Sequence, residues 1–135
     1  MWRLALCVFI GSGIGGVLRF VASKAIDSYM AGCSRWMPAW LAVFPWATFT
    51  VNVTGCFIIG LIYGAVSEGI AMSAEMRTLL TAGFCGGLTT FSTFSHENFL
   101  LFQSGNPAAF ALYIALSVIA GIAAAWAGHT VIRII

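Results

Sequence analysis

Apolar residues gather into four long stretches that are separated by short polar connections. We expect these stretches at about residues 4–26, 39 or 45 to 66, 74–102 and 108–132. A helix needs roughly 20 residues to cross the hydrocarbon core of a bilayer. Almost no chain is left over for a water-soluble domain. The pattern therefore predicts one all-α integral membrane domain of four transmembrane helices over residues 1–135.

The third stretch has a composition that does not suit an uninterrupted helix. Between residues 83 and 94 it holds Gly83, Gly86 and Gly87 together with three threonines and a serine. Each of the paired glycines lowers helix propensity by about 1 kcal/mol relative to alanine. We therefore predict a helix that breaks near the middle of the membrane. Such a break is tolerated only where protein or a polar cavity surrounds it, and broken helices build ion sites from exposed carbonyls and amides.

Composition argues against several classes of function. Hydrophobic residues make up 61% of the sequence and charged residues 7%, whereas a soluble domain carries about 25% charged residues. The net charge of +2 is too small and too scattered to indicate nucleic-acid binding. The four cysteines have no spacing typical of a zinc or redox site. No evident pair of nucleophile and base indicates an enzyme.

The second stretch carries a polar face. Thr48, Asn52, Gly55 and Cys56 fall on one side of a helix. An asparagine without a partner in hydrocarbon is costly, so this face must point at protein or water. Two interpretations stay open for Asn52, which are a hydrogen bond that joins helices and a ligand in a pore.

The first stretch offers small residues and one charge placed late in the span. Gly11 and Gly15 are spaced by four, which lets two helix backbones approach closely. This approach lies either within one chain or between two subunits, and both interpretations stay open. Arg19 follows one turn later, where it either extends to the membrane surface or lines an aqueous vestibule that attracts anions.

The polar groups expected at membrane depth favour a weakly bound anion. They are hydroxyls, one amide and the backbone of the broken helix, and no carboxylate lies within residues 45–66 or 78–96. A multidrug cation exporter would need a buried carboxylate. Phe91 and Phe94 share a helix face, and positive ring edges can contact a small anion. Packing is the alternative for these rings, as it is for Tyr113 and Ser117 on the fourth stretch.

Charges give the chain almost no preferred orientation. Four spans put both ends on one side of the membrane, where three arginines face two or three basic residues on the other side. The positive-inside rule needs an excess on one side. We therefore expect insertion in both orientations and pairing of two antiparallel copies about a two-fold axis.

Taken in order, these pieces resemble the Fluc (CrcB) family of fluoride channels. The first piece is the glycine-rich start with Gly15, Gly16 and Arg19. The second is the segment 50–55, Thr-Val-Asn-Val-Thr-Gly, and the third is the run 83–94, which ends Thr-Thr-Phe-Ser-Thr-Phe. The likeness covers essentially the whole chain, and the third piece together with the asparagine of the second is its most specific part.

The resemblance implies a dual-topology, antiparallel homodimer in the bacterial inner membrane, with two pores at its interface. It implies that eight residues line the fluoride path, with the asparagine reaching in from the partner subunit: Thr48, Asn52, Phe91, Thr93, Phe94, Glu97, Tyr113 and Ser117. It leaves Arg19 as a vestibule residue. It further implies a structural sodium ion on the dimer axis, held by the backbone carbonyls of Gly86 and Thr89 from both subunits.

The sequence therefore predicts a channel that exports fluoride passively, because no ATP-binding motif and no obvious coupling carboxylate is present. Its expected partners are fluoride, sodium, a second copy of the chain and the bilayer, with no nucleic acid. One rival is a small proton-coupled anion transporter that uses His96 or Glu97 as its proton carrier. The other rival is a membrane scaffold that transports nothing and whose glycines serve assembly only.

Overall fold

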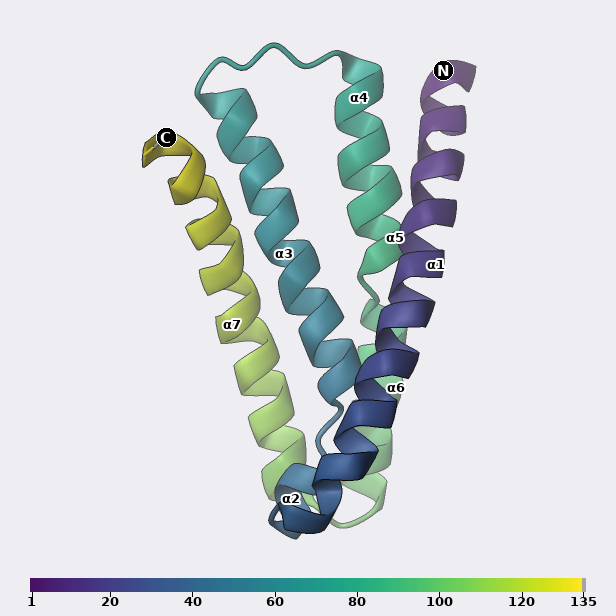
Figure 1. Cartoon of the computed structure of the whole chain (residues 1–135), viewed down its shortest axis with the longest axis vertical. Helices are drawn as coiled ribbons and strands as arrows, with labels where there is room; N and C mark the ends of the chain where they lie inside the picture. The colour runs from purple at the N-terminus through teal and green to yellow at the C-terminus, as the bar shows by residue number, and fades with distance from the viewer. Residues whose placement is uncertain (135) are drawn as a thin grey trace.

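The structure, a computed structural model, describes residues 1–134 and is a bundle of long helices (Figure 1). Three helices are long and apolar enough to cross a membrane: α1 (Trp2–Cys33), α3 (Trp46–Ser67) and α7 (Pro107–Ile134). Over the described range the chain contains no β-strand. This architecture agrees with the predicted all-α integral membrane fold.

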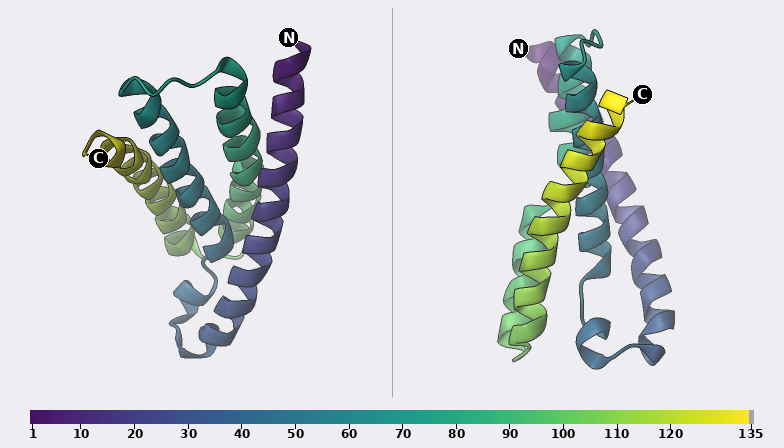
Figure 2. Two further views of the ribbon diagram at one scale, coloured as in Figure 1. Left: turned by 45° about the horizontal axis from the view of Figure 1, so that its top comes forward. Right: turned by 90° about the vertical axis from the view of Figure 1, so that its left-hand side faces the viewer.

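A further column of helical segments joins α3 to α7. It consists of α4 (Ala74–Thr78), the π-helical segment η2 (Leu79–Cys85), α5 (Gly86–Leu88) and α6 (Phe91–Gln103). The column runs from the end that carries both termini to the opposite end (Figures 1 and 2). Its first half packs against α1, while α7 packs along α3.

α3 and α7 begin and end close to the expected boundaries, whereas α1 continues to Cys33 and is longer than the expected 4–26. Of the two starts expected for the second span, the later one agrees with the structure, because α3 begins at Trp46 with Pro45 as its N-cap. Residues Ala39–Ala42 form the separate short helix α2, which a 3₁₀ turn η1 (Ser34–Trp36) connects to α1.

The backbone of the column is interrupted at two threonines. Leu88 ends α5 and Phe91 begins α6, and between them Thr89 (φ −86°, ψ 158°) and Thr90 (φ −147°, ψ 118°) are extended. Gly86 is helical, with φ −63° and ψ −36°. The paired glycines singled out for low helix propensity are therefore not themselves the interruption, which follows them.

The glycines instead allow close contact between α1 and the column. A Cβ built on Gly15 would overlap the Phe84 carbonyl and lie 2.8 Å from the Leu88 nitrogen. A Cβ on Gly87 would lie 2.6 Å from the backbone carbonyl oxygen of Ser12. The small residues of the first stretch were expected to allow close packing either within one chain or between subunits. Gly11 and Gly15 pack within the chain, because both contact the backbone of the column.

Replacing Gly15 by alanine is expected to destabilise the protein by about 1–3 kcal/mol, because the added methyl overpacks a backbone contact. Gly13 on the same helix is the matched control, since a Cβ there meets nothing within 4 Å. Gly13→Ala should leave stability unchanged or raise it through higher helix propensity. Thermal unfolding of the detergent-purified variants measures both changes. Equal midpoints for the two would contradict the packing role of Gly15.

Candidate functional site

Asn52 holds the interrupted backbone from the neighbouring helix α3. Its Nδ2 donates to the Thr90 carbonyl at 3.1 Å, and its Oδ1 accepts from the Thr90 N–H at 2.8 Å. One side chain thereby satisfies both backbone groups of an extended residue, which is what burial of an irregular segment requires. The helix-joining interpretation of Asn52 is therefore observed, and the side chain also faces the cavity described below.

The second threonine starts the next helix. Thr90 Oγ1 accepts from the Thr93 N–H at 3.2 Å, which makes Thr90 the N-cap of α6. The same hydroxyl donates to Thr93 Oγ1 at 3.0 Å. The helix thus has its own start signal immediately after the interruption. The side chain of Thr93 is exposed, so a ligand approaching α6 from outside the chain could reach its hydroxyl.

The interruption releases from helical hydrogen bonding the two carbonyls that the family resemblance implies as sodium ligands, those of Gly86 and Thr89. In an unbroken helix Gly86 O would accept from Thr90 N–H, which instead donates to Asn52. Thr89 O would accept from Thr93 N–H, which instead donates to Thr90 Oγ1. Gly86 is also exposed, and a Cβ there would meet only the Thr81 oxygen at 3.8 Å. Unwound carbonyls at helix ends are the oxygen ligands that sodium sites use, so these residues fit a sodium ion.

Arg19 contacts this same place from α1. Its Nη1 donates to the Thr89 carbonyl at 2.8 Å, and the side chain is half-buried. The sequence had suggested either extension to the membrane surface or a vestibule. The contact with the interrupted backbone was included in neither interpretation.

A cavity of about 290 Å³ lies beside the interruption. Residues from α3, the interruption, α6 and α7 line it: Asn52, Cys56, Thr89, Thr90, Phe91, Phe94, Ser117 and Val118. Four of the predicted path residues therefore face one space. Ser117 Oγ is buried and has no hydrogen-bond partner among residues 1–134, and such a group normally has one. The cavity thus offers an unused hydroxyl donor to a ligand or a water molecule.

The two phenylalanines of α6 form an aromatic wall of the cavity. Their ring centroids are 5.9 Å apart, as the spacing of three predicted. Phe94 also lies 4.9 Å from the Tyr113 ring, centroid to centroid. Phe91 is 80% exposed, so the wall continues to the outer surface of the chain. Its rings can present their positive edges to an anion there.

A hydrogen-bonded cluster, formed by the Glu97 carboxylate and two hydroxyl groups, lies next to the aromatic wall. Glu97 Oε1 accepts from the Thr48 hydroxyl and Oε2 from the Tyr113 hydroxyl, both at 2.7 Å. Thr48 and Tyr113 are buried, so one carboxylate connects α3, α6 and α7. The residues are 49 and 16 positions apart in sequence, and no local pattern pointed to this cluster.

Tyr113→Phe is expected to cost about 1–3 kcal/mol of stability, because it leaves a carboxylate oxygen without its buried donor. In a Glu97→Gln background the same substitution should cost less, since the charge-assisted bond is already lost. Thermal unfolding of both single variants and the double variant measures this coupling. Additive effects would mean that the hydroxyl and the carboxylate do not interact.

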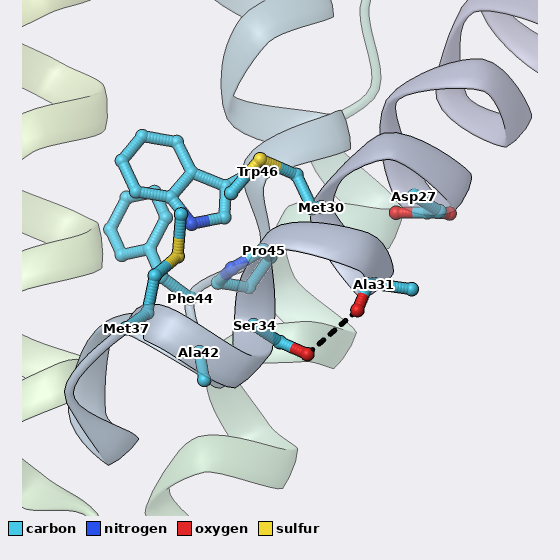
Figure 3. Close-up of a pocket in the computed structure, with 9 residues that line it drawn as sticks. All are labelled: Asp27, Met30, Ala31, Ser34, Met37, Ala42, Phe44, Pro45 and Trp46. Carbon is cyan, nitrogen blue, oxygen red and sulfur yellow. Dashed lines mark hydrogen bonds between the residues drawn. The ribbon is translucent and has the colours of Figure 1, made fainter.

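A second cavity, of about 300 Å³, lies between the end of α1 and the start of α3 (Figure 3). Asp27, Met30, Phe44 and Trp46 are among its lining residues. The hydroxyl of Ser34, the first residue of η1, donates to the Ala31 carbonyl in the last turn of α1 at 2.8 Å. None of the predicted path residues lines this cavity, so it is separate from the site at the interruption.

The fold and the site together define a small multi-pass membrane protein with an ion-compatible cavity at a helix interruption. Comparison with known proteins makes this more specific. Residues 6–129 match the family described as CrcB-like protein, Camphor Resistance (CrcB). The chain belongs to the CrcB family.

Curated relatives of this chain are named fluoride-specific ion channel FluC. One from Flavobacterium psychrophilum is 40% identical over 90% of each chain. One from Phocaeicola vulgatus is 43% identical over 87% of this chain and 88% of its own. One from Rhizobium etli is 42% identical over 96% of this chain and 95% of its own. This is a family of ion channels rather than enzymes, and its apolar helices are those of a multi-pass bacterial inner-membrane protein.

Proposed function

We propose that this protein is a fluoride-selective channel that lets fluoride leave the cytoplasm passively. The observation that carries the proposal is the cavity at residues 89–90, where aromatic edges, an amide and an unpartnered hydroxyl meet in a chain of the CrcB family. Hydroxyl and amide donors hold a small anion by hydrogen bonds. Ring edges attract it without fixing it, and conduction requires binding that is weak enough to release the ion.

The column from α4 to α6 crosses the membrane in addition to α1, α3 and α7, which gives four transmembrane segments. Its interruption lies near the membrane midplane. Residues 74–103 would rise about 45 Å as a helix, which exceeds the hydrocarbon core of about 30 Å. The column runs alongside the long helices over the length of the bundle (Figure 1). Extended backbone at that depth must be buried in protein or line a cavity, and Asn52 and the cavity meet this requirement.

The working unit is an antiparallel homodimer with two pores along its interface. Support comes from surfaces that one chain leaves open, because Phe91 is 80% exposed and a Cβ added at Gly16 would meet nothing within 4 Å. The near balance of basic residues across the membrane supports insertion in both orientations. A second copy then covers the aromatic wall, and Asn52 of each subunit contributes to the neighbouring pore.

Fluoride passes along the aromatic wall between the hydroxyl groups on either side of it. Ser117 donates to the ion first, because its hydroxyl has no other partner in the part of the chain that the structure describes. The hydroxyls of Thr48 and Tyr113 are engaged by Glu97, so they become available to the ion only when the carboxylate moves away. The inside-negative membrane potential, about 2.3 kcal/mol per charge for 100 mV, drives the anion outward.

The backbone carbonyls of Gly86 and Thr89 from each subunit would hold a structural sodium ion on the dimer axis, because the N–H groups that would pair with them in a helix are engaged elsewhere. Bound there, sodium would supply positive charge that stabilises the place where the two interruptions meet. The residues of this chain shape the site, since Asn52 keeps Thr90 N–H away from Gly86 O.

Fluoride efflux from liposomes tests the proposal. Purified protein is reconstituted with potassium fluoride inside, sodium on both sides and the same buffered pH throughout. After valinomycin is added to carry potassium, a fluoride electrode should record rapid release, and matched chloride-loaded liposomes should release nothing beyond protein-free ones. Release that needs a proton gradient would favour the proton-coupled transporter instead. Absence of release would favour the scaffold.

A further inference from the structure

Arg19 supplies a permanent positive charge to the interrupted backbone. The donor is Nη1, the acceptor is the Thr89 carbonyl 70 residues away, and the distance is 2.8 Å. Arginine cannot be neutralised in a protein. The carbonyl is neutral, so this hydrogen bond does not cancel the charge of the guanidinium. The guanidinium of Arg19 is therefore hydrogen-bonded to the Thr89 carbonyl, one of the two carbonyls proposed to bind sodium.

The packing of α1 explains why the guanidinium reaches this point. Gly15 lets α1 approach Phe84 and Leu88 at backbone distance, and Arg19 follows one helical turn later. Its side chain therefore extends past the end of α5, which stops at Leu88. Freed carbonyls carry the negative partial charge of a helix C-terminus. The guanidinium is thus held by geometry and by charge, and it has little freedom to leave.

We propose that Arg19 is a resident cation of the sodium site, which shares the Thr89 carbonyl with the ion and weakens sodium binding. This inference rests on the sodium site of the proposed function. A carbonyl oxygen has two lone pairs, so one oxygen can accept from Arg19 and also face a metal ion. Two positive charges on one oxygen lie a few ångströms apart and repel each other, and the surrounding protein screens them less than water does.

The inference assigns Arg19 a role different from attracting anions in a vestibule. Arg19 keeps the Thr89 carbonyl partnered when sodium is absent, and it limits the affinity when sodium is present. Arg19→Gln removes the charge but keeps an N–H donor. Arg19→Lys keeps the charge but loses the planar fork. The two variants therefore separate charge from hydrogen bonding.

Sodium-dependent thermal stability of the detergent-purified dimer is the readout. A bound ion stabilises the folded protein by RT ln(1 + c/Kd), where c is the sodium concentration, so the rise of the unfolding midpoint with sodium gives Kd, the half-saturating concentration. Sodium chloride is titrated against N-methylglucamine chloride at constant ionic strength. Arg19→Gln should lower the half-saturating sodium concentration by about tenfold or more. Arg19→Lys should stay within about threefold of the wild type, because the charge is kept. Lys24→Gln, an exposed charge on the same helix, should change nothing.

Several outcomes would overturn the inference, and they differ from failure of the sodium site itself. An unchanged or higher half-saturating concentration in Arg19→Gln, with a normal wild-type titration, would show that Arg19 does not compete with the ion. A tenfold drop in Arg19→Lys would show that charge is not the cause, and this variant suffices if the glutamine variant does not fold. No sodium response in either the wild type or Arg19→Gln would reject the sodium site and the inference together.

Discussion

Asn52→Asp abolishes fluoride efflux from liposomes while the protein still purifies as a dimer. The native amide donates to the Thr90 carbonyl and accepts from the Thr90 N–H. A carboxylate can only accept, so one hydrogen bond is replaced by an oxygen–oxygen repulsion. The new charge also faces the cavity that holds the anion. Losing a bond and adding a repulsion, at about 1–3 kcal/mol each, predicts a fall in flux of about 100-fold or more.

The matched control for this change is Asn106→Asp in the turn before α7. That amide donates to Ser104 at the end of α6 and does not line the cavity. Asn106→Asp introduces the same charge elsewhere in the chain and should leave flux within about twofold of the wild type. Wild-type flux in Asn52→Asp would return Asn52 to a packing role that conduction does not need. Equal losses in both variants would assign the effect to added charge in general.

Phe94→Ile cuts fluoride flux by about tenfold or more, because it removes the aromatic ring that lies between Phe91 and Tyr113. The Phe94 ring contacts both Phe91, at 5.9 Å, and Tyr113, at 4.9 Å between centroids. An aliphatic side chain of similar bulk fills space but has no positive edge for an anion. Phe91→Ile should act in the same direction. Initial rates of fluoride release at fixed protein density measure both variants.

Phe99→Ile is the control for the aromatic substitutions, since Phe99 lies on the same helix, is 58% exposed and does not face the cavity. Its flux should equal that of the wild type. Size-exclusion chromatography checks that all three variants remain dimers. Full flux in the Phe91 and Phe94 variants would reject the aromatic wall as the fluoride path and leave the rings with a packing role.

The parts of the site that follow helical spacing could be predicted from the sequence. Asn52 stands at a polar position of α3, and Phe91 and Phe94 are three residues apart on α6, so each pattern gives the face of its own helix. These residues and Ser117 indeed line one cavity. The lengths of α3 and α7 were close to expectation for the same reason, because apolar runs of that length have few other structures available.

The parts that depend on contacts between distant segments could not be predicted. Gly86 and Gly87 were singled out for their low helix propensity, yet Gly87 is needed for contact with Ser12 and the extended residues are the threonines that follow. Propensity describes an isolated helix, whereas packing against α1 decides the outcome here. The Arg19 contact with Thr89 and the Glu97 cluster also join residues from different helices, and no spacing rule reaches across helices.

The reversal potential of the current through a planar bilayer tests the central claim most directly. With a fluoride gradient, equal pH and sodium on both sides, a passive fluoride channel gives current that reverses at the equilibrium potential of fluoride. Adding a chloride or a proton gradient should not move that potential. A reversal potential that follows the proton gradient would contradict passive conduction, and the absence of any fluoride current would contradict a channel altogether.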